Sequence, residues 1–318
     1  MDVRTVLSNL RKNYKNIIWW RDLFLRKLIF PLLFRHNNGI YILQEAWDSL
    51  IILDACRYDV FEEIYRQRKM KGTLEYRISR GTDTISFLLE NFGDKRFNSK
   101  CKEIVYVTAN PFVNKYLKGK FHKIISVWNF GWDEELGVVP PESVYEAALK
   151  AVRKYKGKRF IIHFMQPHYP YITAPEIADD SLKELREAVL QGRKICPKPI
   201  KRHILKISQS NFYLTIDKEI HFKAYKENLR LAMPYVEKLI DILPGKTVVT
   251  ADHGEAFGET LCSFKLIKIY GHPAQVRIPV LTKVPWLIIK PEEKKKRNLE
   301  KELARIRARR IRRYKVIR

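Results

Sequence analysis

Cysteine is scarce in this sequence, and its scarcity excludes two kinds of small protein. The chain contains Cys56, Cys101, Cys196 and Cys262, which are too few and too scattered for a disulfide scaffold. No Cys-x-x-Cys pair is present, so a zinc site built from thiolates is not expected. This use of cysteine favours a reducing compartment. We expect the chain to fold around a hydrophobic core, since 46% of its residues are hydrophobic.

Acidic residues are also in short supply. The chain has 35 Asp and Glu against 61 Lys and Arg, a net charge of +26, which indicates anionic partners. Phosphorylated or sulfated molecules, acidic lipids and nucleic acid all carry the complementary charge. Nucleic acid is the least favoured of these, because the sequence has no zinc-finger spacing, no RNP-like aromatic motif and no KH-type loop.

A long uncharged apolar run is missing as well. The most apolar early stretch is Ile17–Phe34 (IIWWRDLFLRKLIFPLLF). Its charged and helix-breaking residues are Arg21, Asp22, Arg26, Lys27 and Pro31. Charges in the middle of a span are unfavourable in a bilayer, so we do not expect this stretch to cross one.

Two interpretations of residues 1–40, a basic amphipathic helix region, stay open. In the first, the helix lies in a membrane interface, where paired tryptophans beside basic residues fit. In the second, it packs on the protein's own core. With no signal peptide evident, we expect a cytoplasmic location, and the first interpretation adds a peripheral position on the inner membrane surface.

After this region, runs that favour strands alternate with helical patterns. The predicted strands are Ser49–Leu53, Glu75–Ile78, Glu103–Val107, Lys123–Val127, Phe160–Phe164 and Lys246–Thr250. The predicted helices are Val60–Arg68, Thr84–Asn91, Pro141–Tyr155 and Lys223–Ile242. The alternation predicts an α/β domain over residues 41–290, with a mainly parallel central sheet covered on both faces. Residues 173–222 are interpreted as an insertion and candidate lid, and residues 291–318 as a cationic C-terminal helix.

Several predicted strands end at residues that bind metals or anions. The first strand ends at Asp54, and Arg57 follows one turn later with a planar fork for a phosphate or sulfate. Thr84 begins the second predicted helix, and the last strand is followed by Asp252 and His253. In parallel sheets, ligands gather at the carboxyl ends of the strands. Each group also has a structural interpretation, as a helix cap or a turn.

Histidines add nitrogen ligands to this set. His168 lies in MQPHYP, after the fifth predicted strand, and His272 lies in the turn YGHP. His163 lies inside an apolar run, and we expect it to be an inward strand residue with a core hydrogen bond. Mixed carboxylate, hydroxyl and imidazole ligands suit Zn²⁺ or Mn²⁺.

The motifs LDACRYD, Gly-Thr-x-Thr, MQPHYP, ADHGEAFGE and YGHP, in this order, resemble those of the alkaline phosphatase superfamily. The resemblance is to its sulfatase-like branch, which includes phosphoethanolamine transferases and lipoteichoic acid synthases, and it implies a three-layer α/β/α sandwich. The implied ligands of the main metal are Asp54, Thr84, Asp252 and His253. Thr84 is also the implied nucleophile, and His168 and His272 are the implied ligands of a second metal or of the substrate's anionic oxygens.

The resemblance implies a metal-dependent hydrolase or transferase that acts on phosphate or sulfate esters of a glycan or lipid. The Cys-x-Pro-x-Arg motif of classical sulfatases does not occur in the chain. One metal site is expected, and the second stays open because MQPHYP offers no aspartate. A catalytically inactive, anion-binding protein of the same fold is the first alternative, and a basic nucleic-acid-binding protein is the second.

Overall fold

The computed structural model describes residues 11, 13–34, 36–178, 181–192, 218–261, 268–295 and 297–316. At its centre is a seven-stranded sheet with the order β2-β9-β6-β1-β5-β3-β4. The strands are β1 (Ser49–Leu53), β2 (Thr73–Ile78), β3 (Ile104–Thr108), β4 (Lys123–Ser126), β5 (Arg159–Phe164), β6 (Thr247–Ala251) and β9 (Lys283–Ile289). Of these, β9 runs antiparallel to both of its neighbours, and the other pairs are parallel. The predicted mainly parallel sheet is confirmed.

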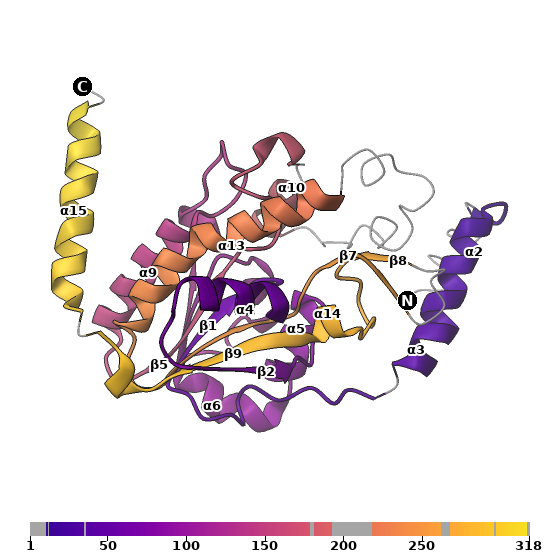
Figure 1. The fold of residues 1–318 in the computed structure, drawn as a ribbon, viewed down its shortest axis with the longest axis horizontal. Coiled ribbons are helices and arrows are strands. Elements are labelled where there is room, and N and C mark those ends of the chain that lie inside the picture. The colour runs from indigo at the N-terminus through magenta and orange to yellow at the C-terminus, as the bar shows by residue number, and fades with distance from the viewer. Residues whose placement is uncertain are drawn as a thin grey trace.

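Helices cover both faces of this sheet. Alternate strand residues point to opposite sides, and in β1 the residues on both sides are buried, so each face needs a covering layer. Ile51 and Leu53 of β1 belong to a core shared with α4 (Tyr58–Gln67), α9 (Pro141–Lys154) and α13 (Lys218–Ile240). Leu50 and Ile52 belong to a core shared with α5 (Thr84–Phe92), α6 (Asn98–Lys102) and α7 (Phe112–Leu117). Figure 1 shows these two helical layers with the sheet between them. The predicted three-layer α/β/α arrangement is therefore present.

Every predicted strand and helix has a counterpart, and the structure adds others. The short helices are η2 (Lys95–Phe97), α8 (Val127–Phe130), η3 (Pro175–Ile177), α10 (Ser181–Leu190), α14 (Pro279–Thr282) and η5 (Pro291–Glu293). Strands β7 (Ala256–Thr260) and β8 (Lys268–Gly271) form a separate antiparallel pair. The candidate lid, residues 173–222, contains η3 and α10, but residues 193–217 lie outside the described part of the chain. Its role as a lid stays a prediction.

The register of the three central strands brings their carboxyl ends to one level. Leu53, the last residue of β1, is paired with Phe164 of β5 on one side and Ala251 of β6 on the other. Asp54 and Asp252 are the next residues of β1 and β6, so they emerge next to each other at the carboxyl edge of the sheet. The fold thus places the two predicted carboxylates together.

Helical segments flank the two ends of the molecule in Figure 1. At one end, α2 (Ile17–Phe24), the π-helical turn η1 (Leu25–Ile29) and α3 (Phe30–Leu33) form a continuous helical segment. At the other end lies α15 (Leu299–Val316), the counterpart of the predicted cationic helix. None of the helices in the described ranges has the length and apolar character needed to cross a membrane.

Candidate metal centre

The candidate centre begins with Thr84, the first residue of α5. Its neighbour Asp83 is the N-cap of this helix, and the Asp83 carboxylate accepts a hydrogen bond from the Ser86 backbone N–H. The sequence allowed Thr84 to be the cap, and the structure shows that it is not. Because Asp83 satisfies the helix terminus, the Thr84 hydroxyl is available for the sheet edge.

That hydroxyl contacts the residues that follow β6. Thr84 Oγ1 donates a hydrogen bond of 2.8 Å to Asp252 Oδ2 and lies 3.4 Å from His253 Nε2. His253 Nε2 in turn lies 3.7 Å from Asp54 Oδ1 and 3.4 Å from Asp252 Oδ2. Ligand atoms of Asp54, Asp252 and His253 all lie within 4.8 Å of one another. The structure therefore brings together the four residues predicted to share a metal.

The tautomer of His253 is fixed by the backbone. Its Nδ1 lies 2.8 Å from the carbonyl oxygen of Gly254, which can only accept, so Nδ1 carries the hydrogen and donates it. In the neutral imidazole with this tautomer, Nε2 has the lone pair, and Nε2 faces the carboxylates and Thr84. This is the state that a metal-binding imidazole requires.

The charge balance of the centre fits a cation. Asp54, Asp252 and His253 are fully buried. Burial, followed by the negative charge of Asp252, raises the pKa of Asp54 well above its usual value. Among the described residues, neither Asp54 Oδ1 nor His163 Nε2 has a hydrogen-bond partner. Two close carboxylates, with a carboxylate oxygen and an imidazole nitrogen that make no hydrogen bond, match the donor set of a divalent metal such as zinc or manganese.

His163 on β5 lies closer to the centre than the sequence indicated. Its Nδ1 is 3.0 Å from the Tyr106 hydroxyl, which confirms the expected core contact. Its Nε2, however, points toward the carboxylates, 3.7 Å from Asp54 Oδ2 and 4.0 Å from Asp252 Oδ2. Burial lowers the pKa of His163 to about 4, so its imidazole is neutral at pH 7.

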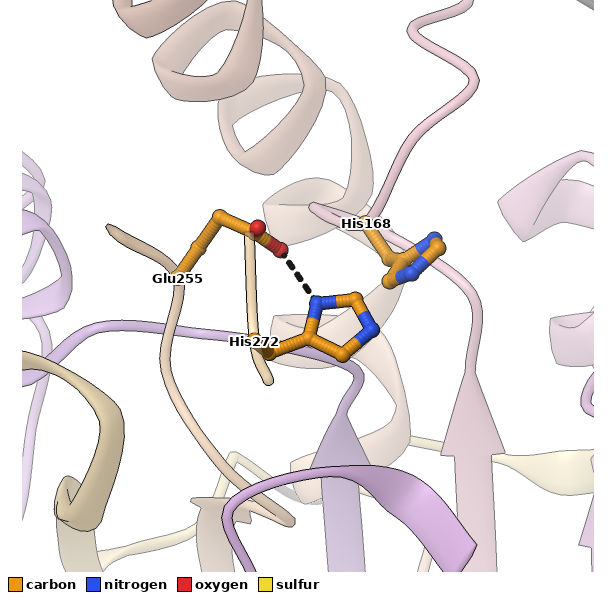
Figure 2. A group of neighbouring side chains, drawn as sticks. All are labelled: His168, Glu255 and His272. Carbon is orange, nitrogen blue, oxygen red and sulfur yellow. Dashed lines mark hydrogen bonds and ion pairs between the residues drawn. The ribbon is translucent and has the colours of Figure 1, made fainter. Parts of the chain in front are cut away.

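A second group of ligands adjoins the first. Figure 2 shows His168, Glu255 and His272 converging from three separate segments of the chain. Their ligand atoms also lie within 4.8 Å of one another, and His272 Nδ1 is 3.0 Å from Glu255 Oε2. The ring centroids of His253 and His272 are 4.5 Å apart, so the two groups form one continuous site. The predicted pair His168 and His272 is therefore brought together, with Glu255 as an additional member.

The two histidines of this second group differ in charge. Burial opposes protonation of both, yet the carboxylate of Glu255 raises the pKa of His272 to about 9. Burial would raise the pKa of Glu255, but His272 and the other histidines lower it to about 2. For His168, burial and the neighbouring His272 lower the pKa to about 4. A neutral His168 and an ionised Glu255 suit a second metal, and a cationic His272 suits an anionic oxygen.

Two further residues orient the carboxylates. Asn110 Nδ2 donates to Asp54 Oδ2 at 2.7 Å, and the backbone N–H of Ala55 donates to Asp252 Oδ1 at 3.0 Å. Ala55 has a positive φ of 59°, a conformation that residues with a side chain adopt at a cost of about 1–2 kcal/mol. The Tyr225 hydroxyl on α13 holds this turn, as it donates to Ala55 O at 2.7 Å and accepts from Arg57 N at 2.8 Å.

The Arg57 guanidinium is held by carboxylates that belong to neither ligand group. Its guanidinium forms ion pairs with Asp59 and Glu259, both at 2.6 Å, and donates to the Glu255 carbonyl oxygen at 3.3 Å. It also lies against the rings of Phe222 and Phe257. Most of its hydrogen-bond donors are thus used inside the protein. Its role in binding an anionic substrate stays a prediction.

The sequence contained signals for some of the residues that it missed. Asn110 lies two residues after β3, at the same sheet edge as Asp54, so the rule that ligands follow strands applies to it. Glu255 is inside the motif ADHGEAFGE that carries Asp252 and His253. Ala55 is likewise inside the motif LDACRYD, whereas Tyr225 carried no such signal, because its contact depends on how α13 packs over the sheet.

Comparisons with known proteins find similarity among solved structures. No protein-family model matches the chain, and no curated protein matches it. The C-terminal periplasmic domain of EcEptC from Escherichia coli, in complex with Zn, is 12% identical over 83% of this chain and 82% of that chain, with a TM-score of 0.44. Streptococcus pyogenes phosphoglycerol transferase GacH, in complex with sn-glycerol-1-phosphate, is 14% identical over 87% and 76%, with a TM-score of 0.42.

A third similar structure is a protein in the alkaline phosphatase superfamily from Vibrio parahaemolyticus. It is 13% identical over 78% of this chain and 60% of that chain, with a TM-score of 0.41. This is the superfamily whose motifs the sequence resembles. At these identities and TM-scores the similarity is one of general architecture, and the chemistry of the site rests on the chain's own side chains.

Proposed function

We propose that this chain is a metal-dependent enzyme that hydrolyses or transfers phosphate esters, or sulfate esters, of a glycan or lipid, with Thr84 as its nucleophile. The observation that carries the proposal is the hydrogen bond from Thr84 Oγ1 to Asp252 Oδ2 within a buried group that includes Asp54 and His253. A cap or a turn does not require a buried hydroxyl that donates to one carboxylate and lies beside an imidazole. A site that activates this hydroxyl does.

Asp54, Thr84, Asp252 and His253 would hold the metal, and zinc and manganese suit their oxygen and nitrogen atoms. A divalent cation bound there supplies Lewis acidity, which favours the deprotonated form of a hydroxyl. Asp252 Oδ2 already accepts the hydrogen of Thr84 Oγ1, so it is the group placed to receive that proton. Ala55 N–H holds the other oxygen of the same carboxylate and keeps Oδ2 turned toward Thr84.

The proposed reaction has two steps. In the first, Thr84 Oγ1 forms a bond to phosphorus while the bond from phosphorus to the departing alcohol breaks. His272, protonated at neutral pH because of Glu255, stabilises the developing negative charge and can donate a proton to the departing oxygen. In the second step, water or another alcohol attacks phosphorus and gives its proton to His272, while the bond from phosphorus to Thr84 breaks and Thr84 Oγ1 regains its proton from Asp252. Water makes the enzyme a hydrolase, and an alcohol makes it a transferase.

The test compares Thr84→Ala with the matched control Thr282→Ala, a buried threonine whose hydroxyl donates to the carbonyl oxygen of Ile278, the N-cap of α14. Metal content and hydrolysis of bis(4-nitrophenyl) phosphate are measured for both. We expect Thr84→Ala to lower turnover by ~10²-fold or more, by analogy with the loss of other transition-state contacts, and Thr282→Ala to keep activity. Full activity with normal metal content in Thr84→Ala would exclude the assignment. A metal-free wild type that is inert toward phosphate esters would favour the anion-binding alternative.

A further inference from the structure

An apolar stripe is exposed along the N-terminal helical segment Ile17–Leu33. Its members lie four residues apart on one face of the helix, and their exposed fractions are 43% for Trp20, 52% for Phe24, 48% for Leu28 and 65% for Leu32. Leu33, beside the last of them, is 57% exposed. We refer to Trp20, Phe24, Leu28 and Leu32 as the exposed stripe.

The other face of the same segment is fixed to the domain. Leu25 and Phe30 are buried in a core that includes Ala256, Ile269 and Val276, from β7, β8 and the loop before α14. The orientation of the helix is therefore set by packing, and the exposed stripe points away from its own core. The interpretation that this region packs on the protein's own core is therefore confirmed for the buried face, and the membrane interpretation stays a prediction for the other face.

Large exposed apolar side chains are concentrated on this helix. The others in the described part of the chain are distributed over several elements, and include Tyr76 on β2, Leu89 on α5, Phe130 on α8, Leu190 on α10, and Ile220 and Leu231 on α13. Scattered apolar residues are ordinary on a protein surface, whereas a contiguous stripe indicates a surface that contacts another protein or a membrane.

The charge of the chain indicates which of these partners the stripe contacts. Lys15 and Lys27 are exposed on or next to the helix, and the whole chain carries +26. A second copy of the chain would bring the same positive charge and be repelled, whereas an anionic bilayer surface is complementary. The Trp20 indole N–H already donates to Tyr14 O at 3.0 Å, which leaves the apolar body of its ring for a membrane interface.

We propose that the exposed stripe inserts into the interfacial region of an anionic lipid bilayer, with the helix lying in the plane of the membrane. Its buried face rests on Ala256, the residue after Glu255, and on Ile269 of β8, which leads to His272. Membrane attachment through this helix would therefore hold the second ligand group at a fixed orientation to the lipid surface. The proposal does not depend on the reaction, since vesicle binding is measured without turnover.

The experiment uses the full chain and vesicles of either phosphatidylcholine alone or equal parts of phosphatidylcholine and phosphatidylglycerol. The stripe variant combines Phe24→Ser, Leu28→Ser and Leu32→Ser. The control variant combines Phe130→Ser, Leu89→Ser and Leu231→Ser, which removes the same side chains from exposed sites elsewhere. Wild type and control are expected to co-sediment with the anionic vesicles, and the stripe variant to bind more than about tenfold more weakly.

A second measurement does not depend on the stripe variant folding. Vesicles with brominated acyl chains are expected to quench tryptophan fluorescence of the wild type, and Trp20→Phe to lose part of that quenching. No vesicle binding by the wild type would overturn the proposal, as would equal binding by the stripe and control variants, which would mean that surface charge alone is responsible. A wild-type dimer that the stripe variant dissociates, with no change in vesicle binding, would identify a second copy as the occupant and also overturn it.

Discussion

The Tyr225 hydroxyl donates a hydrogen bond of 2.7 Å to the carbonyl oxygen of Ala55, and so joins α13 to the turn that follows β1. Ala55 is held at positive φ, and its own N–H bonds to Asp252 Oδ1. A tyrosine that contacts no substrate in the proposed mechanism therefore orients one of the four proposed metal ligands. Tyr225 is a positioning residue for the centre.

Replacing Tyr225 with phenylalanine tests this role. The substitution removes the donor to Ala55 O and leaves the buried Arg57 N–H without its acceptor, so the free energy of unfolding should fall by about 1–3 kcal/mol. Turnover should fall with less change in KM, because Asp252 would lose its fixed orientation. Steady-state kinetics and urea denaturation measure both. Tyr235→Phe, on the same helix, is the control, and an equal loss of turnover in the two variants would contradict the positioning role.

Substituting Asp54 with asparagine separates metal binding from folding. Burial and Asp252 raise the pKa of Asp54, so the folded protein loses stability as pH rises through that pKa and the carboxyl group ionises. Asparagine stays neutral, so the variant does not lose this stability. In a chelator at pH 8, Asp54→Asn should therefore melt at or above the temperature of the wild type. Added zinc or manganese should raise the melting temperature of the wild type and do little for the variant. Equal stabilisation of both by metal would show that Asp54 is not a ligand.

The Glu255–His272 pair predicts a pH dependence of the metal-free protein. The pKa of His272 rises from 6.5 to about 9, so its contribution to stability is complete below 6.5 and lost as pH rises through 9. The pKa of Glu255 falls from 4.5 to about 2, so its contribution is present above 4.5 and lost as pH falls through 2. The difference in unfolding free energy between wild type and His272→Gln should be largest between pH 4.5 and 6.5, where both contributions are complete, and should shrink toward pH 9. Chemical denaturation across pH in a chelator measures it, and a difference that grows toward pH 9 would refute it.

Much of the fold could be predicted from the sequence because its central strands are apolar on both faces. Strand β9 was missed because Pro285 interrupts it, and proline is unusual inside a sheet. The structure shows why it is tolerated there. Pro285 lies opposite Tyr76 of β2, one residue beyond the last pair of β6 and β9, so its missing N–H removes no bond between those two strands.

The candidate site was predictable to the extent that its residues follow strands. Asp54 and Asp252 are brought together by parallel register, which the sequence pattern implies. The packing of α13 is not encoded in any short motif, so the Tyr225 contact could not be inferred. The ion pair of Arg57 could not be inferred either, because its partner Glu259 is 202 residues away in the chain.

Variants of Arg57 and Glu259 distinguish two roles of this arginine, which are anchoring the segment that carries Glu255 and binding the substrate's anionic oxygens. If Arg57 anchors the segment that carries Glu255, breaking its ion pair from either side should have the same effect. Arg57→Lys keeps the charge but loses the planar fork, and Glu259→Gln removes the partner. Both should lower the free energy of unfolding by roughly 1–3 kcal/mol and reduce turnover to a similar degree, with KM for a phosphodiester little changed.

The matched control is Arg68→Lys, because Arg68 makes a comparable pair with Glu237 at 2.6 Å on the surface of α13, away from the site. Exposed pairs contribute about 0–1 kcal/mol, so this variant should retain stability and activity. A rise in KM in Arg57→Lys alone, with Glu259→Gln unaffected, would instead show that Arg57 binds the substrate's anionic oxygens. That result would also require the guanidinium to leave Asp59 and Glu259 when substrate binds, because both carboxylates now occupy its donors.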